Sequence, residues 1–196
     1  MDIFEHLSMI PFLLIAMGIV RILEGVVMII HRQQNSPETI KLYWPHGLLT
    51  LTILMTMIVF WWNAFNLNQT GIYTKEVWAI WEYALYILPC LMLFLIGDLL
   101  FPNDLEQSRE VCIKDFYFKQ HREVFLFITV YGLITFVNAN IFFLQPLDAT
   151  STLWLLSIVS ITLPMAIWKN QYLHCVLNVF FFINSIFIAT FNWQLG

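Results

Sequence analysis

The sequence contains, at residues 8–30, the stretch SMIPFLLIAMGIVRILEGVVMII, which decides the fold. Only two charged residues, Arg21 and Glu24, interrupt this apolar run. A helix that crosses the hydrocarbon core of a bilayer needs about 20 mostly apolar residues. The stretch therefore predicts a transmembrane helix that carries two charged residues within its apolar length.

Five further apolar runs follow, at residues 44–65, 77–101, 117–144, 150–168 and 172–193. Polar connectors separate the runs, and the longest connector is 102–116. Lipid offers no hydrogen bonds to the backbone, and these runs lack the alternation of barrel strands, so we expect helices. The prediction is an all-α fold, a polytopic membrane helix bundle with six transmembrane helices, formed as a single domain by residues 1–196.

Composition supports the same class of protein. Hydrophobic residues make up 60% of the chain and charged residues 11%, whereas a soluble domain has about 45–50% and about 25%. The net charge of −4 is thinly spread and argues against a nucleic-acid partner. The three cysteines form no closely spaced pair, and HExxH, GxSxG, GxGD and Walker-type motifs are absent from the sequence. We therefore expect no enzyme, no bound metal and no cofactor.

Positive charges give the predicted orientation. Seven of the nine Lys and Arg residues lie in or beside the first, third and fifth connectors: Arg32, Lys41, Arg109, Lys114, Lys119, Arg122 and Lys169. Only Lys75 flanks the second connector, and Arg21 lies inside a helix. Because cytoplasmic loops carry the excess of Lys and Arg, we expect the odd connectors in the cytoplasm and both termini on the outer side.

Arg21 and Glu24 form the most informative polar pair. They lie three residues apart and therefore share one face of the first predicted helix. Counting residues from the outer end places Arg21 near the bilayer midplane, where a charge costs at least about 2.5–3.5 kcal/mol. The pair predicts an ion, proton or anionic-substrate site, with an ion pair that only fixes helix packing as the alternative. Gly18 and Gly25 on the same side favour close approach of another helix.

Glu82 is a second candidate, on the third predicted helix. It shares a face with Tyr86 and Pro89 and lies toward the outer end. An isolated carboxylate there could exchange protons or bind a cation, or it could be a solvated interfacial residue. Pro89 has no N–H, so the carbonyl of Leu85 is left without its helical donor.

Four polar residues from other helices are expected at the cytoplasmic level of Glu24. They are His46, Asp98, His174 and Asn178. Together with Arg21 and Glu24 they predict a polar cavity that opens toward the cytoplasm and acts as a transport or ion site. The two histidines could also bind a haem or form a proton relay, or they could be interfacial residues that bond their neighbours.

Part of the sequence resembles a pattern in small, functionally uncharacterised bacterial membrane proteins with six helices. The pattern covers roughly the first 125 residues and consists of Tyr43-Trp44-Pro45-His46, Phe60-Trp61-Trp62, Glu82, Pro89 and Phe101-Pro102. The resemblance implies a multi-pass protein of the bacterial inner (plasma) membrane. It implies no function and no cofactor.

The leading functional prediction is a channel or transporter for a small ion or solute, with proton linkage. The first alternative is a non-catalytic membrane subunit or effector that forms a homo-oligomer or docks a protein partner through connector 102–116. The second alternative is a redox subunit that carries haem. In each case the lipid bilayer surrounds the chain.

Overall fold

The computed structural model describes residues 3–36, 39–69, 79–102, 111–141 and 149–194. Within these residues it contains six helices, which confirms the predicted all-α class. They are α1 (Ile3–Asn35), α2 (Trp44–Gln69), α3 (Ile80–Leu99), α4 (Ile113–Ile141), α5 (Ala149–Ile167) and α6 (Gln171–Gln194).

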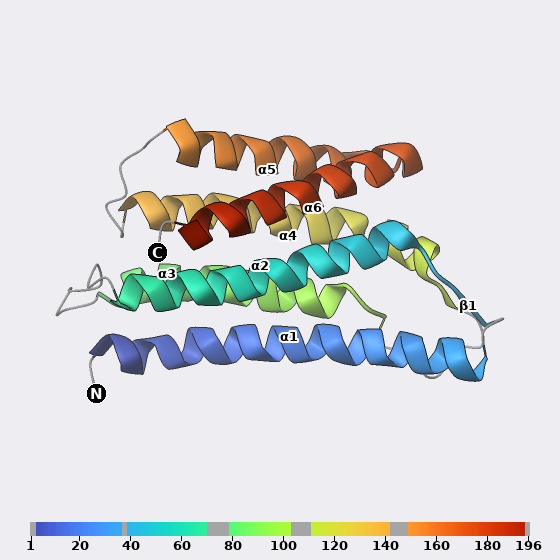
Figure 1. Ribbon diagram of the computed structural model, residues 1–196, viewed down its shortest axis with the longest axis horizontal. Coiled ribbons are helices and arrows are strands. Elements are labelled where there is room, and N and C mark those ends of the chain that lie inside the picture. The colour runs from blue at the N-terminus through green and yellow to red at the C-terminus, as the bar shows by residue number, and fades with distance from the viewer. Residues whose placement is uncertain (1–2, 37–38, 70–78, 103–110, 142–148, 195–196) are drawn as a thin grey trace.

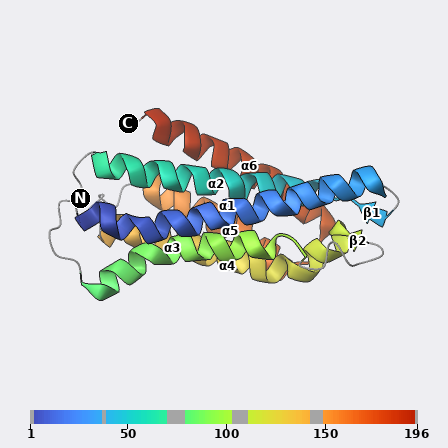
Figure 2. The same ribbon diagram turned by 90° about the horizontal axis from the view of Figure 1, so that it is seen from below.

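The helices stack in layers (Figure 1). α1 packs against α2 and α3, which form the second layer. α3 in turn packs against α4 and α2 against α6, while α5 covers α4 and α6 on the side away from α1. Figure 2 shows the bundle from the α1 side. α1 is therefore an outer helix, and α1 begins at the same end of the bundle at which α6 ends.

Four helices are long and apolar enough to cross a membrane, among the residues that the structure describes: Met9–Asn35, Trp44–Asn63, Ile80–Leu99 and Gln171–Thr190. Thr152–Ile167 in α5 is a shorter apolar helix. The outer surface of α1 exposes large apolar side chains at helical spacing: Met9, Leu13, Met17, Val20, Leu23, Val27 and Ile30. A soluble protein rarely exposes so continuous an apolar face. These are the features of a membrane protein.

Two very short strands join two connectors. β1 (Ile40–Lys41) pairs in parallel with β2 (Val111–Cys112), so that Ile40 lies opposite Val111. The connector between α1 and α2 therefore touches the connector between α3 and α4. The sequence did not predict this pairing, because two residues are too few for a strand pattern.

Some helices extend beyond their apolar runs. α1 continues to Asn35 rather than residue 30, and α4 begins at Ile113 rather than residue 117. Charged and polar residues such as Arg32 and Lys114 are good helix formers, so the helices do not stop where the apolar run stops. Residues 103–110 of the expected connector, which include Arg109, lie outside the described residues, as does Lys75.

Prolines and caps set several helix ends and contacts. Pro45 occupies the first turn of α2, where its missing N–H costs nothing. The Asn170 side chain accepts hydrogen bonds from the backbone N–H groups of Tyr172 and Leu173, at 3.0 and 3.2 Å, and so caps the start of α6. These local signals place the start of α6 beside the end of α5, with His174 in its first turn.

Candidate functional site

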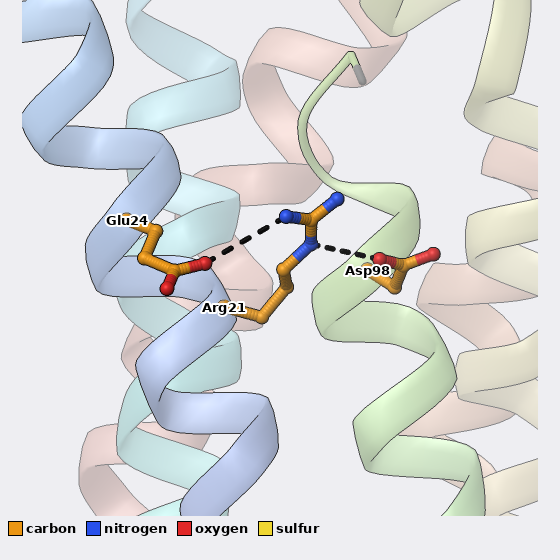
Figure 3. Close-up of polar contacts among 3 residues, drawn as sticks. All are labelled: Arg21, Glu24 and Asp98. Atoms are coloured by element: carbon orange, nitrogen blue, oxygen red, sulfur yellow. Dashed lines mark hydrogen bonds and ion pairs between the residues drawn. The ribbon is translucent and has the colours of Figure 1, made fainter.

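Three charged residues meet between α1 and α3. Arg21 Nε donates a hydrogen bond to Asp98 Oδ1 at 2.8 Å, and Arg21 Nη1 lies 3.7 Å from Glu24 Oε2 (Figure 3). The side chains of Arg21, Asp98 and Glu24 are 35%, 44% and 56% exposed. One guanidinium therefore bridges two carboxylates at a place that is open on one side. We call these residues the Arg21 triad.

Glycines bring α1 and α3 close enough for this contact. A Cβ atom on Gly97 would lie 3.2 Å from the carbonyl oxygen of Gly18. A Cβ atom on Gly25 would overlap the ring of Phe101. Small residues at a helix interface allow such close backbone approach. The α1–α3 seam, formed by Gly18, Gly25, Gly97 and Phe101, thus positions Arg21 against Asp98.

The Arg21 triad lies at one end of α3. Asp98 is the penultimate residue of α3, and Arg21 lies level with it. The sequence placed Arg21 near the bilayer midplane, but α1 has 33 residues and α3 only 20. From Arg21 to Asn35, α1 continues for about 21 Å at 1.5 Å per residue. Counting along α1 does not give the level of Arg21 relative to the end of α3, and its depth in a bilayer stays a prediction.

A second polar group connects α4, α6 and the end of α5. Tyr117 Oη lies 2.7 Å from His174 Nδ1, and His174 Nε2 lies 2.9 Å from the carbonyl oxygen of Trp168. Asn178 Nδ2 donates to Tyr117 Oη and to the carbonyl of His174, both at 2.9 Å. All three side chains are buried. We call Tyr117, His174, Asn178 and the Trp168 carbonyl the Tyr117 network.

The partners fix the direction of every hydrogen bond in the Tyr117 network. A carbonyl oxygen only accepts, so His174 Nε2 must carry the proton. In a neutral ring Nδ1 is then the acceptor, and the Tyr117 hydroxyl donates to it. Asn178 donates to the same hydroxyl. The arrangement holds a neutral His174 in a single tautomer.

His46 lies between the two polar groups. Its Nε2 is 2.7 Å from the carbonyl oxygen of Leu100, two residues after Asp98. Its ring packs edge-on against Phe101, at a centroid distance of 5.4 Å, and against Tyr117, at 6.4 Å. The predicted inner group therefore divides into a charged part on α1 and α3 and a neutral part on α4 and α6, with His46 between them.

The two histidines do not fit a bis-histidine haem site. Both ring nitrogens of His174 already have partners at hydrogen-bond distance. The Tyr117 ring contacts both histidine rings, where a porphyrin would have to lie. Among the described residues, no three His, Cys, Asp or Glu side chains are grouped so that they could hold a metal ion.

Glu82 lies away from both groups, at the opposite end of α3. Sixteen residues separate it from Asp98 in the sequence, about 24 Å along a helix. Its Oε2 accepts a hydrogen bond from the backbone N–H of Ala79 at 2.9 Å, which caps the start of α3. Three residues further along, Asn138 Nδ2 of α4 donates to the Leu85 carbonyl at 2.8 Å. The Leu85 carbonyl, which Pro89 was expected to leave without a helical donor, therefore accepts a hydrogen bond that connects α3 to α4.

Sequence reasoning missed several residues around the Tyr117 network. The ring of His121 lies 5.6 Å from that of His174, and Tyr43 packs edge-on against Tyr117 at 5.2 Å. Burial, followed by the contact with Cys175, raises the pKa of Tyr43, so this phenol stays neutral. A cavity of about 10 Å³ lies beside His46, Tyr117 and His121, close to the smallest volume that holds one water. In the sequence, the four-residue spacing of Tyr117 and His121, which places both on one helix face, was the signal that could have pointed to these residues.

Comparisons with protein-family models, with curated proteins and with solved structures found no match to this chain.

Proposed function

We propose that the protein is an integral membrane channel or transporter for a small cation, linked to protons, and that the Arg21 triad is its exchange site. The observation that carries the proposal is one guanidinium between two carboxylates, at 2.8 and 3.7 Å. Charged side chains within membrane segments usually mark ion or proton pathways.

The charges of the Arg21 triad do not balance. With every group ionised, one positive charge faces two negative charges, which leaves an excess of one negative charge. Asp98 holds the short, direct contact with Arg21, whereas Glu24 makes the longer contact and is the more exposed. In an apolar environment a surplus carboxylate gains from binding a proton or a cation. Glu24 is therefore the group that exchanges its partner, while Asp98 keeps its direct contact with Arg21.

The membrane arrangement is part of the proposal. All six helices cross the bilayer, the odd connectors face the cytoplasm and both termini face outward, in a bacterial inner membrane. Arg32, Lys41, Lys114, Lys119, Arg122 and Lys169, which lie in or beside the odd connectors, support this orientation. The Arg21 triad, at the connector end of α3, would then be reached from the cytoplasm.

Two places among the described residues leave little room for a solute. The cavity beside His46 is large enough for one water molecule at most, and the α1–α3 seam is tightly packed. Transport therefore requires a second conformation. Because α1 is an outer helix with neighbours on one side only, movement of α1 against α3 would open the Arg21 triad without displacing the helices beyond them.

Flux measurements test the proposal. Purified protein is reconstituted into liposomes that contain a pH-sensitive dye, and proton flux is recorded under gradients of Na⁺ and K⁺. We expect wild-type flux in at least one gradient, a loss of about tenfold or more in Glu24→Gln, and a similar loss in Asp98→Asn. Glu123→Gln, which neutralises an exposed carboxylate on α4, is the matched control and should retain flux. If the wild type carries no flux, or if Glu24→Gln matches it, the transport proposal is wrong.

A second candidate function follows from the exposure of the triad. Charges that face lipid are costly, and a second copy of the chain or another membrane subunit could cover the open side of the Arg21 triad and the apolar face of α1. The protein would then be a subunit rather than a transporter. Native mass spectrometry in nanodiscs separates the two: a stable dimer that Arg21→Gln dissociates, together with no flux, favours the subunit.

A further inference from the structure

We propose that the Tyr117 network is an acid-sensitive latch between α4 and α6, which closes only while His174 is neutral. α6 packs its backbone against α2 and α5. The Tyr117 network joins it to α4 through side chains alone. A change in these few hydrogen bonds therefore changes how α6 is held.

A proton on His174 would change the hydrogen bonds of its ring. Both ring nitrogens of an imidazolium are donors. Nε2 can keep its bond to the Trp168 carbonyl, but Nδ1 must now donate to Tyr117 Oη, which reverses that bond. The phenol hydrogen then needs a new acceptor. The Tyr117 oxygen can accept from both Nδ1–H and Asn178 Nδ2–H, but no acceptor then faces the phenol hydrogen among these partners.

Asn178 cannot resolve this conflict without losing a bond. Its Oδ1 is buried and has no hydrogen-bond partner. A flip of the side-chain amide, which exchanges Oδ1 and Nδ2, would present an acceptor to the phenol. The same turn places Oδ1 beside the carbonyl oxygen of His174, where Nδ2 now donates at 2.9 Å. Two acceptors then face each other, and Nδ2 takes the position without a partner. Protonation therefore either leaves the buried phenol hydrogen without an acceptor or removes the bond from Asn178 to the His174 carbonyl, and both outcomes cost free energy.

The surroundings offer no compensating charge. On α4, His121 faces His174 at a ring-centroid distance of 5.6 Å, and a second imidazolium there would repel the first. On α6 the neighbour is Cys175, which contacts the Tyr43 hydroxyl at 3.9 Å. Within the described residues no carboxylate pairs with His174. The nearby cation Lys114 donates from its Nζ to Gln171 Oε1, at the start of α6, at 2.6 Å.

His46 contacts the Tyr117 ring from α2, and its own bond goes to the Leu100 carbonyl. The side chains that face the Tyr117 network from the packed elements are thus neutral or positive, and only the Trp168 carbonyl favours an imidazolium. Acid should loosen α6 from α4, whereas neutral pH should hold the two helices together.

Nitrogen NMR of labelled histidine in the purified full-length protein gives the first test. The His174 signals are assigned by their absence in His174→Gln. At about pH 7.5, above the ordinary histidine value of about 6.5, we expect a neutral His174 with its proton on Nε2. A proton on Nδ1, or an imidazolium at this pH, would overturn the proposal.

Thermal unfolding in detergent gives the second test and needs no transport assay, so its failure is distinct from failure of the proposed function. Between about pH 7.5 and about pH 5, the wild-type Tm should fall by on the order of 5 °C more than that of His174→Gln. Tyr117→Phe removes the phenol hydrogen and should also reduce the fall in Tm at acid pH. This variant keeps the test available if His174→Gln does not fold.

Two control variants complete the design. Asn184→Leu removes a neutral amide tie on the same helix, the 3.2 Å bond from Asn184 to Ser157, and should keep the wild-type pH effect. His121→Gln removes the ring that would repel an imidazolium at His174, so it should weaken the pH effect without abolishing it. If the pH effect persists in both His174→Gln and Tyr117→Phe, or if it disappears in His121→Gln alone, the latch is not at His174.

Discussion

The Arg21 triad and the Tyr117 network lie at the same end of the bundle but are built in opposite ways. The triad is charged, half-exposed and situated on an outer helix. The Tyr117 network is neutral, buried and closed by a backbone carbonyl. His46 lies between the two and bonds to the chain just beyond Asp98.

This difference assigns different roles to two groups that look alike in the sequence. A buried network bonds its polar atoms to one another, so a change in protonation state disturbs its geometry. A half-exposed ion pair can exchange partners, because each charge retains access to water, ions or another chain. Exchange is therefore expected at the triad, and control of helix packing at the Tyr117 network.

The largest expected loss of stability comes from adding a side chain at the α1–α3 seam, whose close packing positions Arg21 against Asp98. Gly25→Leu places a side chain where the Phe101 ring lies. The free energy of unfolding should fall by about 2–3 kcal/mol, which is a Tm decrease of roughly 4–12 °C in a chain of this size. Gly47→Leu is the control, because nothing lies within 4 Å of a Cβ atom on Gly47. Equal Tm values for the two variants would show that the α1–α3 seam is not tightly packed.

Removing the guanidinium should have the next largest effect. Arg21→Leu leaves Asp98 and Glu24 without a cation, and we expect a loss of about 1.5–3 kcal/mol in unfolding free energy. Adding Asp98→Leu should recover part of the loss. The double-mutant cycle should therefore show coupling of about 1 kcal/mol or more. Strictly additive losses would mean that the ion pair does not hold α1 to α3.

Tyr117→Phe should cost less, about 1–2 kcal/mol at neutral pH, because two neutral hydrogen bonds are lost. The salt dependence separates the two regions. High salt should reduce the difference between wild type and Arg21→Leu, since half-exposed charges are screened. It should leave the difference between wild type and Tyr117→Phe unchanged. A loss in Tyr117→Phe that depends on salt would contradict the neutral assignment.

The smallest effect is expected at the far end of α3. Asn138→Leu removes the tie to the Leu85 carbonyl and should cost about 0.6–1 kcal/mol, the range for single hydrogen bonds between membrane helices. In a Pro89→Ala background α3 has its own donor for that carbonyl, and the same substitution should cost less. Thermal unfolding of the four proteins measures this. An unchanged cost would show that Asn138 does not compensate for Pro89.

The helical class followed from the sequence because uninterrupted apolar runs of this length leave the backbone few alternatives. The free carbonyl at Leu85 was also predictable, since the missing N–H of Pro89 is a covalent fact. Helix ends were less accurate. The first turn of α4 begins at Ile113 among charged residues, which carry no apolar signal although they favour a helix.

The candidate site was predicted as a group of residues but not as an arrangement. Arg21 was paired with Glu24 because they share one helix face, whereas its closer partner Asp98 is 77 residues away in the sequence. Sequence spacing describes one helix at a time and does not give the order in which helices pack. The same limit concealed Tyr117, which acquires its role only when α6 brings His174 and Asn178 against it.

The strand pair has a consequence for biosynthesis. β1 emerges before α2 and β2 after α3, so Ile40 and Val111 can pair only when both intervening helices have been placed. In the proposed membrane arrangement, failure of one of the two helices to insert would leave the strands on opposite sides of the bilayer. The four paired residues could then not meet. In that arrangement, the backbone hydrogen bonds between β1 and β2 exclude a molecule in which only one of α2 and α3 has crossed the bilayer.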